Sequence, residues 1–498
     1  MEFGPAIAQG RIVLFRGSAN THWPALCRPL MIRIFSQYVS PKSLMLMAME
    51  SLLISLALLC GVFVRFWNQP LEFDTFVQFP DFAVQVAIFV IIFQICFYYS
   101  DLYNLHTMRT RYEQLLRLGQ SLGAGCLVLG IVYYIFPNLL IGRGVFFIST
   151  ALAATFVMVS RVALDRAWQF AAPKQNILIL GTHELAVTVA RELARRDDLN
   201  LQLVGFVRTS GTPDNQQELF GHPIVGTTDN LEAIATEQRV ARIIVALEDR
   251  RLKMPTRDLV KLRVQGIRVE DAHSTISSLS GRVWLNTVQP SWFVFSDGFH
   301  RSKTTLVLKR ILDLSVGLIG LMLSLPLMLL VAIAIRLDSR GTVIYRQTRV
   351  GYRGKCFELL KFRSMCVNAE RENGAAWASK NDSRITRVGR FIRKFRLDEL
   401  PQFINVIRGE MSFVGPRPER PVFVDQLRQE ISYYDERHSV RPGLTGWAQV
   451  QYGYGASVEA AFGKLEYDLF YLKNMSLLFD FAIMLQTIRI VLTGSGSR

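Results

Sequence analysis

Two adjacent carboxylates, Asp398 and Glu399, are the residues of this sequence whose types and setting best suit chemistry on a phosphate. Arginines and a lysine surround them in Phe391–Pro418, which reads FIRKFRLDELPQFINVIRGEMSFVGPRP. Apolar residues around Pro401 recur at intervals of three and four, which predicts a short amphipathic helix. The pair would then lie at a helix N-terminus, where the dipole favours anions and free N–H groups point outward. This setting suggests that a phosphate and a divalent cation meet here.

A capped surface helix with solvated charges is the alternative interpretation of the same residues. The distribution of charge bears on this choice. The formal net charge is +16, and residues 301–420 hold 23 Lys and Arg against 10 Asp and Glu, an excess of 13. A basic region can bind nucleic acid. In a chain with membrane spans, however, we expect anionic lipid headgroups and diphosphate substrates as partners, and no nucleic acid.

Metal-binding and disulfide patterns are missing from the sequence. The six cysteines are scattered, with no CxxC and no zinc-ligand spacing, and the seven histidines form no HxxxH pair. We therefore predict neither a disulfide framework nor a zinc site.

Four long apolar segments follow a basic N-terminal segment, residues 1–42. They are Ser43–Phe66, Asp81–Tyr99, Leu115–Phe136 and Gly144–Val162. Each is near the ~20 residues that span a bilayer. Basic residues flank the group at both ends, and an acidic loop follows the first segment. The positive-inside rule therefore predicts four transmembrane helices at residues 43–170 with both ends in the cytoplasm. Four buried core helices are the alternative.

Strand and helix patterns alternate over residues 173–270, which predicts a parallel α/β sheet of the Rossmann type. The strand candidates are Asn176–Leu180, Leu203–Val207, Ile224–Val225 and Ile243–Leu247. The dinucleotide fingerprint after the first strand is poor, because His183 and Ala186 stand where the second and third glycines after Gly181 would be. A side chain at the second position obstructs a pyrophosphate. We therefore expect a structural or regulatory module in preference to an NAD enzyme.

A fifth apolar run, Leu306–Ile335, follows a predicted linker at residues 271–302. Basic residues flank the run on both sides, which favours cytoplasmic positions for both of its ends. Ser324 and Pro326 lie in its middle, and a proline there removes a helical hydrogen bond and kinks the helix. We predict a re-entrant helix–break–helix hairpin at residues 306–337. A conventional fifth span is the alternative.

Several short polar motifs follow this run. They are YRQTRVGYRGKCFELLKFRSM at 345–365, NDSRITRVGRFIRKFRLDELPQ at 381–402, SFVGPRPERP at 412–421 and RPGLTGWAQV at 441–450. Together and in this order, the motifs resemble the bacterial sugar transferase family, the polyprenyl-phosphate phosphoglycosyl transferases with a monotopic catalytic domain. The resemblance covers about residues 303–498. It implies the long form of the family: an α-helical membrane bundle, a Rossmann-like α/β module and a mainly α monotopic catalytic domain with a re-entrant membrane hairpin.

The resemblance also implies a reaction. A sugar-1-phosphate, with glucose or galactose as the expected hexose and glucose favoured, would pass from a UDP-sugar to polyprenyl (undecaprenyl) phosphate. UMP would leave, and the product would enter exopolysaccharide or other glycoconjugate assembly as its first membrane step. Asp398 matches the nucleophile that carries a covalent phosphosugar, and Glu399 is implied to help hold Mg²⁺ beside it. The positions implied to contact substrate phosphates or to position the dyad are Lys361, Arg363, Arg393 and Arg417. Ser324 and Pro326 match the family's helix break.

The physical chemistry of these residues agrees with the implied roles. A carboxylate beside arginine is ionised at neutral pH, although it is a weak nucleophile. Attack on a diphosphate requires its charge to be cancelled, which Mg²⁺ and arginines can do. The expected location is the bacterial inner (cytoplasmic) membrane, with the catalytic domain on the cytoplasmic face and membrane lipids as partners. The oligomeric state stays open, a homodimer included.

Two other functions compete with this one. A membrane-anchored nucleotide-sugar dehydratase or epimerase would use the Rossmann-like module and a Tyr-x-x-x-Lys pair. The sole such spacing, Tyr38 and Lys42, lies upstream of that module and contains Pro41. A non-catalytic scaffold of a polysaccharide assembly complex would use the C-terminal domain for binding alone.

Overall fold

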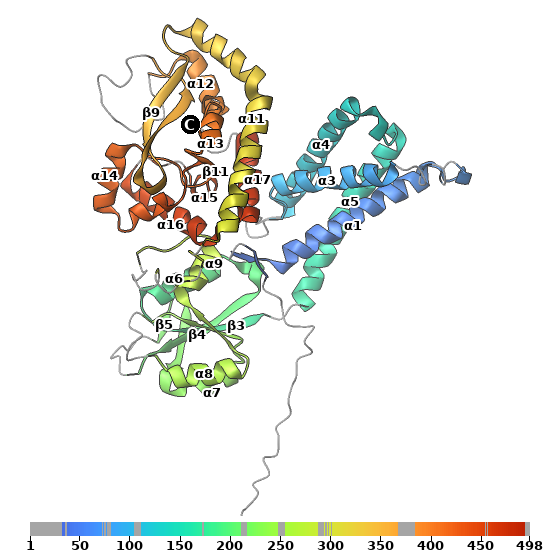
Figure 1. Cartoon of the computed structure of the whole chain (residues 1–498). Coiled ribbons are helices and arrows are strands. Elements are labelled where there is room, and N and C mark those ends of the chain that lie inside the picture. Colours follow the sequence, from blue (N-terminus) through green and yellow to red (C-terminus); the bar gives the residue numbers. More distant parts are fainter. Residues whose placement is uncertain are drawn as a thin grey trace, which may run out of the picture.

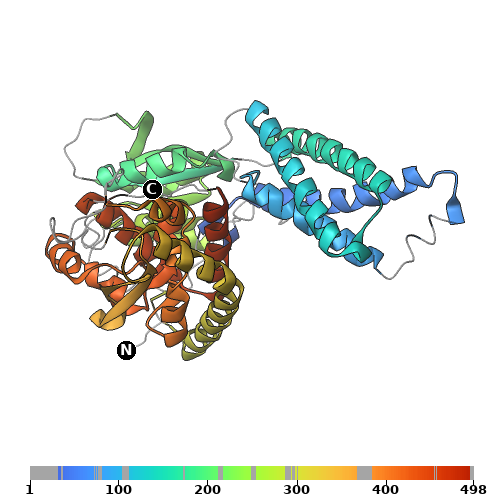
Figure 2. The ribbon, with the colours of Figure 1, turned by 90° about the horizontal axis from the view of Figure 1, so that it is seen from above.

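The structure is a computed structural model that describes most of residues 32–493. The residues outside its description are 1–31, 35–36, 72, 74–75, 77–80, 104–110, 172–173, 211–216, 248–253, 287–292, 294–295, 297, 300, 367–383, 454, 456 and 494–498. Most of the predicted basic segment at residues 1–42 lies outside the described residues. The described chain forms a helical bundle, an α/β module and a C-terminal domain, and the bundle extends to one side of the other two (Figures 1 and 2).

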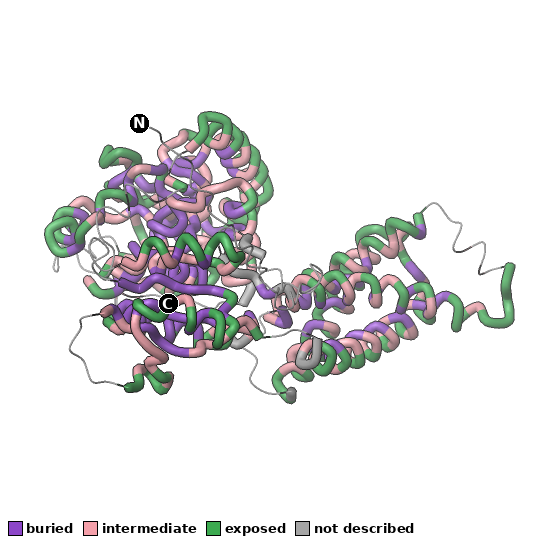
Figure 3. The backbone as a smooth tube through the Cα atoms, turned by 90° about the horizontal axis from the view of Figure 1, so that it is seen from below, coloured by how far each residue is buried: buried purple, intermediate pink, exposed green. Residues whose placement is uncertain are grey.

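The N-terminal part consists of four long apolar helices. They are α1 (Pro41–Arg65), α3 (Phe82–Tyr99), α4 (Arg111–Ile135) and α5 (Arg143–Ala171). A small antiparallel pair, β1 (Ile32–Ile34) and β2 (Gln37–Val39), precedes them. By length and composition all four helices can cross a membrane. They confirm the four predicted helical segments, and Figure 3 shows many exposed residues along them, as expected of surfaces that face lipid.

One buried ion pair joins the first and last helices of this bundle. The Glu50 carboxylate of α1 accepts from Arg161 Nε of α5 at 2.7 Å and from the Tyr103 hydroxyl at 2.7 Å. Glu50 is fully buried and Arg161 is nearly so. Charges inside a membrane are costly unless they are paired, so these contacts fix the packing of α1 against α5.

The α/β module is built on a six-stranded sheet. Its strands are β3 (Gln175–Leu180), β4 (Leu201–Arg208), β5 (Glu218–Leu219), β6 (His222–Thr227), β7 (Arg242–Val245) and β8 (Arg268–Asp271). The order is β5-β6-β4-β3-β7-β8, and each neighbouring pair is parallel apart from β5 with β6. The predicted strands and the predicted parallel α/β sheet are confirmed.

Helices cover both faces of this sheet, which is why β3 is an uninterrupted apolar run. The helices are α6 (Glu184–Ala194), α7 (Leu231–Glu237), α8 (Thr256–Val264) and α9 (Ala272–Ser280). One face packs against α6 and α9, and the other against α7 and α8. The helix α9 lies within the segment 271–302 that was predicted to be a linker. It begins at an Asp271 cap, whose carboxylate accepts from the Ser274 N–H at 3.0 Å.

The fifth apolar run forms a single long helix, α11 (Lys303–Asp338), with Pro326 inside it. Figure 1 shows α11 following the C-terminal domain and bending near one end. Helical structure continues through the predicted break, and the Ser324 hydroxyl donates back to the Leu321 carbonyl at 3.3 Å. Positions 322, 323 and 325, next to the proline, are strongly exposed leucine and methionine side chains. The re-entrant arrangement of this helix therefore stays a prediction.

The C-terminal domain packs against one face of α11 along most of its length. Its elements are β9 (Ile344–Val350), β10 (Cys356–Phe362), α12 (Arg387–Lys394), α13 (Gln402–Arg408), β11 (Ser412–Val414), α14 (Pro421–Glu430), β12 (Gly443–Thr445), α15 (Trp447–Gln451), α16 (Val458–Asn474) and α17 (Leu477–Thr493). An antiparallel β9–β10 hairpin and a parallel β11–β12 pair accompany the helices. Buried residues of both ends of α11 join this domain, at Asp313 and Gly317 and again at Val331 and Ile335.

The α/β module is joined to the C-terminal domain by contacts of its last segment. Arg282 Nη1 lies 3.2 Å from the Glu466 carboxylate of α16, and the Trp447 indole donates to the Gly281 carbonyl at 2.8 Å. Arg282 also lies over the Trp284 ring at 4.3 Å from its centre. The module is thus held by α15 and α16, both of which also contribute to the core of the C-terminal domain.

Candidate active site

The two carboxylates lie in a short turn between α12 and α13. Arg396 precedes the turn in a left-handed backbone conformation with a φ of 56°, which is uncommon for a side chain other than glycine and costs on the order of 1 kcal/mol. A 3₁₀ turn, Leu397–Glu399, follows it. Leu397 and Leu400 pack against the buried end of α11. The direction in which Asp398 and Glu399 point is therefore set by a strained residue that the packing of its neighbours holds in place.

The predicted amphipathic helix is confirmed as α13, and Gly409 ends it with a φ of 81°. Two of the N–H groups beside the carboxylates, which were predicted to be free, are paired with backbone carbonyls. The Glu399 N–H donates to the Arg396 carbonyl at 3.2 Å, and the Leu400 N–H to the Leu397 carbonyl at 3.3 Å. Because α13 has only seven residues, its dipole is also short. The positive field at this site comes from side chains.

Two cations from other elements converge on Glu399. Arg417 Nη2 lies 2.6 Å from Oε1, and Lys361 Nζ lies 3.3 Å from the same oxygen. Lys361 comes from the end of β10, and Arg417 comes from the loop that follows β11. The structure therefore brings together four of the predicted residues, Asp398 included, from three separate segments of the chain.

The two carboxyl groups differ in their affinity for protons. Burial raises the pKa of Asp398 to about 6, against the lowering effect of Lys361, and the neighbouring Glu399 charge raises it further. Burial also acts to raise the pKa of Glu399, but Arg417 and then Lys361 hold that pKa far below its usual value. Glu399 is consequently a permanent anion, while Asp398 changes its charge near neutral pH. Such a separation of two neighbouring pKa values is typical of functional sites.

Arg393 also acts on the dyad. It lies in the last turn of α12, and its carbonyl accepts the Arg396 N–H at 3.2 Å. Its charge lowers the pKa of Asp398. Arg393 is therefore one of the cations that act on the predicted nucleophile, and its role toward substrate stays a prediction.

Arg363 contacts the end of α11 in this structure, and its role toward substrate or dyad stays a prediction. Its guanidinium donates to the Ser339 carbonyl at 2.7 Å and to the Arg340 carbonyl at 3.1 Å. It is 6% exposed. Because Arg363 follows the last residue of β10, its side chain reaches the carbonyls at the end of α11 and fixes that helix end. Lys361, two residues earlier, is the member of this motif that reaches the dyad.

Sequence reasoning missed a second layer of charge behind Arg417. Arg437 is buried and donates to the Arg417 carbonyl at 3.0 Å, while it pairs with Asp468 of α16 at 2.8 Å. Arg349 of β9 donates to the Pro418 carbonyl at 3.1 Å and pairs with Glu419 at 3.3 Å. These residues hold the loop that carries Arg417. Arg437 and Arg349 are distant from this loop in the sequence. The one indication in the sequence was that Arg349 lies inside the motif at 345–365.

The dyad suits a divalent cation only if the substrate supplies further ligands. The described residues contain no group of three or more His, Cys, Asp or Glu side chains placed to hold a metal. Both ion-pair contacts of Glu399 fall on Oε1, so Oε2 and the Asp398 carboxylate are the oxygens left for a metal. Mg²⁺ usually takes one or two carboxylates together with substrate phosphates, and this donor set fits that pattern.

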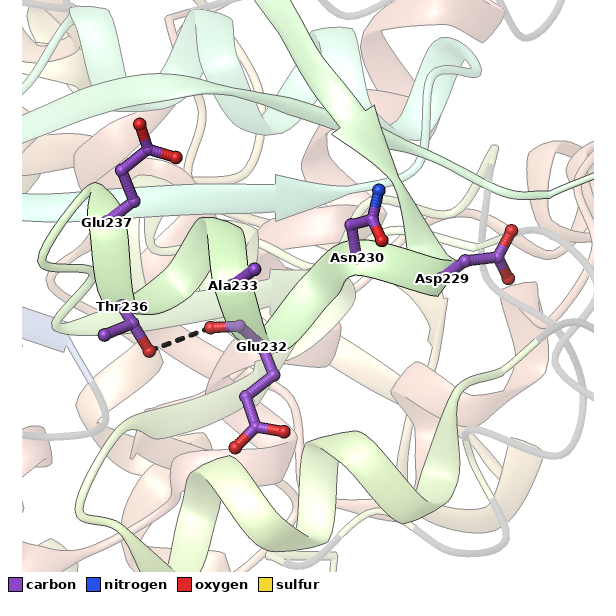
Figure 4. Close-up of a pocket in the computed structure, with 6 residues that line it drawn as sticks. All are labelled: Asp229, Asn230, Glu232, Ala233, Thr236 and Glu237. Atoms are coloured by element: carbon purple, nitrogen blue, oxygen red, sulfur yellow. Dashed lines mark hydrogen bonds between the residues drawn. The ribbon is translucent and has the colours of Figure 1, made fainter.

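A hollow lies in the α/β module. Its volume is about 680 Å³, and it is lined by residues of the segment from Asp229 to Glu237, shown in Figure 4. Three of its six lining side chains are acidic, and one of them, Glu232, accepts from Lys261 at 2.6 Å. An acidic hollow repels a diphosphate, so its charge is opposite to that of the dyad's surroundings.

The glycine after β3 has a packing role. Gly181 has a φ of 127°, and a Cβ there would lie 2.3 Å from the Ala246 carbonyl oxygen. The absence of a side chain is therefore required by the neighbouring strand, whether or not a ligand approaches. This agrees with the poor dinucleotide fingerprint.

Comparisons with known proteins match two parts of the chain. The family model described as bacterial sugar transferase matches residues 304–494. A model described as a CoA-binding domain matches residues 99–270, which include the α/β module. The first model thus matches the C-terminal domain, and the second matches the region before it.

Relatives of known name match the chain to different extents. A UDP-N-acetylgalactosamine-undecaprenyl-phosphate N-acetylgalactosaminephosphotransferase of Aeromonas hydrophila is 50% identical over 191 residues, which is 38% of this chain and 45% of that protein. A UDP-glucose:undecaprenyl-phosphate glucose-1-phosphate transferase of Escherichia coli (strain K12) is 44% identical over 184 residues, 36% of this chain and 39% of that protein. The chain thus aligns with less than half the length of these two relatives.

One relative matches nearly the whole chain. A UDP-glucose:undecaprenyl-phosphate glucose-1-phosphate transferase of Xanthomonas campestris pv. campestris is 30% identical over 427 residues, which is 83% of this chain and 88% of that protein. Its alignment therefore extends well beyond the C-terminal domain. The match over most of both chains, together with the family match at residues 304–494, shows that this chain belongs to the bacterial sugar transferase family.

Proposed function

We propose that this protein transfers a sugar-1-phosphate from a UDP-sugar to polyprenyl phosphate, with Asp398 as the nucleophile. The observation that carries the proposal is the pair of unlike carboxylates in a cationic setting. Asp398 has a raised pKa of about 6, and Glu399 beside it is held ionised by Arg417 and Lys361. One group can thus attack phosphorus while the other anchors the cations that bind the substrate phosphates.

The first step is attack by an Asp398 carboxylate oxygen on the phosphorus that bears the sugar. A new P–O bond joins that phosphorus to Asp398, and the phosphoanhydride bond to the other phosphate breaks. UMP leaves with the electron pair of the broken bond. Burial raises the pKa of Asp398 and removes water from its carboxylate, which makes that carboxylate a better nucleophile at neutral pH.

The second step regenerates the free carboxylate of Asp398. An oxygen of polyprenyl phosphate attacks the same phosphorus, the bond from phosphorus to Asp398 breaks, and the carboxylate leaves with its electron pair. The product is a polyprenyl diphosphate-sugar. One phosphoanhydride bond is lost and one is formed over the two steps, so the reaction needs no hydrolysis of a nucleotide.

The cations of the site have distinct tasks in both steps. Arg417 presents a planar fork that suits two phosphate oxygens at once, and its loop is held in place by Arg437. Lys361 and Arg393 add positive charge near Asp398. We infer that these three side chains stabilise the charge that accumulates on the transferred phosphoryl group. When bound to Glu399 and Asp398, Mg²⁺ would supply further charge neutralisation.

The long apolar helix suits a lipid acceptor. α11 carries strongly exposed apolar side chains around Pro326, and its two ends both pack against the C-terminal domain. We propose that α11 enters the cytoplasmic leaflet of the inner membrane and returns, which keeps the dyad at the level of the acceptor phosphate. The apolar helices of the bundle support a membrane location.

Exchange of labelled UMP into a UDP-sugar tests the covalent mechanism. The purified protein with Mg²⁺ and without lipid acceptor should catalyse the exchange, and Asp398→Asn should abolish it. Product formation that requires both substrates, with no exchange, would exclude the covalent intermediate. Polymer production that survives Asp398→Asn in cells would favour a scaffold instead of an enzyme.

The sugar is the least constrained part of the proposal. The relative with 50% identity over the C-terminal region is named for N-acetylgalactosamine, whereas the two glucose relatives are 44% and 30% identical over their matches. A panel of UDP-sugars, read by UMP release, separates these donors. A preference for UDP-N-acetylgalactosamine over UDP-glucose and UDP-galactose would overturn the hexose favoured by the sequence.

A further inference from the structure

The bundle touches the C-terminal domain through the C-terminal end of α3. Asp101 follows α3 with a left-handed backbone, at a φ of 59°. Its carboxylate is held by both terminal nitrogens of Arg489 on α17, with Nη1 donating to Oδ1 at 2.6 Å and Nη2 donating to Oδ2. Nearby, the Tyr99 hydroxyl donates to the Leu485 carbonyl of α17 at 3.2 Å. A two-nitrogen contact of this kind fixes orientation as well as distance.

The helix that receives these contacts is firmly attached to the rest of the C-terminal domain. Asp480 of α17 lies 2.6 Å from Lys309 of α11 and accepts from the Tyr471 hydroxyl of α16 at 2.7 Å. The same Lys309 ammonium donates to the Val414 carbonyl at 2.9 Å. All these groups are buried or nearly so. A displacement of α17 therefore moves the apolar helix α11 with it.

Val414 also connects this region to the dyad. It is the last residue of β11, and Arg417 lies three residues farther along the chain, where it holds Glu399. At the other side of the domain, α17 makes the hydrogen bonds to Tyr99 and Asp101 of the bundle. Figures 1 and 2 show α17 between α11 and the bundle. The bundle thus contacts α17, which connects both to the membrane-facing helix α11 and to the active-site loop that carries Arg417.

We propose that Asp101 and Arg489 are positioning residues through which the membrane bundle sets the height and tilt of the catalytic domain over the bilayer. The proposal rests on the function proposed above. The two half-reactions differ in what they need from the membrane. The UDP-sugar is water-soluble and reaches the dyad at any height, whereas the phosphate of the polyprenyl acceptor is confined to the headgroup layer. Loss of the contact should therefore impair the acceptor step and spare the donor step.

The test uses the full chain in lipid vesicles with the variant Asp101→Asn. Asparagine tolerates the left-handed backbone and removes the charge. The KM for polyprenyl phosphate should rise roughly three- to tenfold, while the KM for the UDP-sugar and the rate of UMP exchange without acceptor stay within about twofold of wild type. Retained exchange also shows that the variant is folded.

Three further variants sharpen the result. Arg489→Gln should act like Asp101→Asn, and the double variant should be no worse than either single one, as a shared contact requires. Arg489→Lys keeps a charge and should restore part of the acceptor affinity. Asp165→Asn is the matched control: it removes another ion pair of the bundle, with Lys42 at 2.7 Å, that does not reach α17, and it should leave the acceptor KM unchanged.

Failure of this inference is distinguishable from failure of the proposed mechanism. Wild-type protein without UMP exchange would remove the covalent mechanism, and the ratio of acceptor KM to donor KM would still report on Asp101. Equal losses of exchange and transfer in Asp101→Asn, or an unchanged acceptor KM, would overturn the positioning role. Effects of the two single variants that multiply in the double variant would overturn it as well.

Discussion

Charges in the α/β module and charges around the dyad are arranged in opposite ways. In the module, three ion pairs each join one cation to one anion: Arg196 lies 2.9 Å from Asp198, Arg242 lies 3.3 Å from Glu270, and Lys261 lies 2.6 Å from Glu232. Such closed pairs hold elements together and leave little field for a ligand. The module's large hollow is also acidic.

Around the dyad, cations outnumber the two carboxylates. Arg417 and Lys361 share Glu399, while Lys361, Arg393 and Arg417 all act on Asp398. The excess positive charge is partly buried, which costs free energy unless an anion arrives. Closed ion pairs in the module therefore serve structure, whereas an excess of cations over carboxylates at the dyad suits a multiply charged substrate.

The largest loss of activity is expected from removing the anion at the centre of the cationic site. Glu399→Gln leaves Arg417 and Lys361 without their shared partner, and we expect UMP exchange to fall about 100-fold or more. The substitution also removes the charge that helps raise the pKa of Asp398, so the residual activity should persist to lower pH. Glu358→Gln is the control, because Glu358 makes an exposed pair with Arg346 at 3.6 Å. Exchange that is equally impaired in both variants would contradict the special role of Glu399.

A change in the shape of one cation should have a smaller effect. Arg417→Lys keeps the charge but replaces a planar fork with a point charge, and we expect a loss of about tenfold or more in kcat/KM for the UDP-sugar. Arg346→Lys, at an exposed position of the same domain, should change kcat/KM by less than about twofold. Steady-state kinetics with varied UDP-sugar measure both. An unchanged kcat/KM in Arg417→Lys would show that only the charge matters.

The α/β module and the surroundings of the dyad also differ in how much of their structure can be predicted from the sequence. Apolar runs specify β3 and its neighbours, since a strand buried on both faces has a simple pattern. α9 was missed because its serines, at positions 274, 277, 278 and 280, mask the apolar periodicity of Ile276 and Leu279. Near the dyad, the residue types and the charge of the sequence pointed to Asp398 and Glu399, whereas Lys361, Arg417 and Arg363 came from the family resemblance, and the side chain of Arg363 turns to a helix end. Arg437 meets Arg417 and Asp468 only in the folded chain, and no local pattern reveals such contacts.

The pH dependence should separate the two carboxylates. Because the pKa of Asp398 is raised to about 6, this group gains a proton as the pH falls through about 6 and then cannot attack phosphorus. Glu399 stays ionised over the same range, since its pKa is held far below the usual value. kcat/KM for the UDP-sugar should therefore rise with pH through about 6 and lose about tenfold per unit below it. A profile that is flat from pH 5 to 7 would contradict the raised pKa.

The smallest effect on activity is expected from a change in the α/β module. Glu232→Gln removes the exposed pair with Lys261 at the edge of the acidic hollow. An exposed ion pair contributes little to stability, and neither group touches the dyad in the described structure. UMP exchange and transfer to polyprenyl phosphate should both stay within about twofold of wild type. A substantial fall in either rate, with the thermal unfolding midpoint unchanged, would show that the hollow is coupled to the active site. The charges of this module would then not be purely structural.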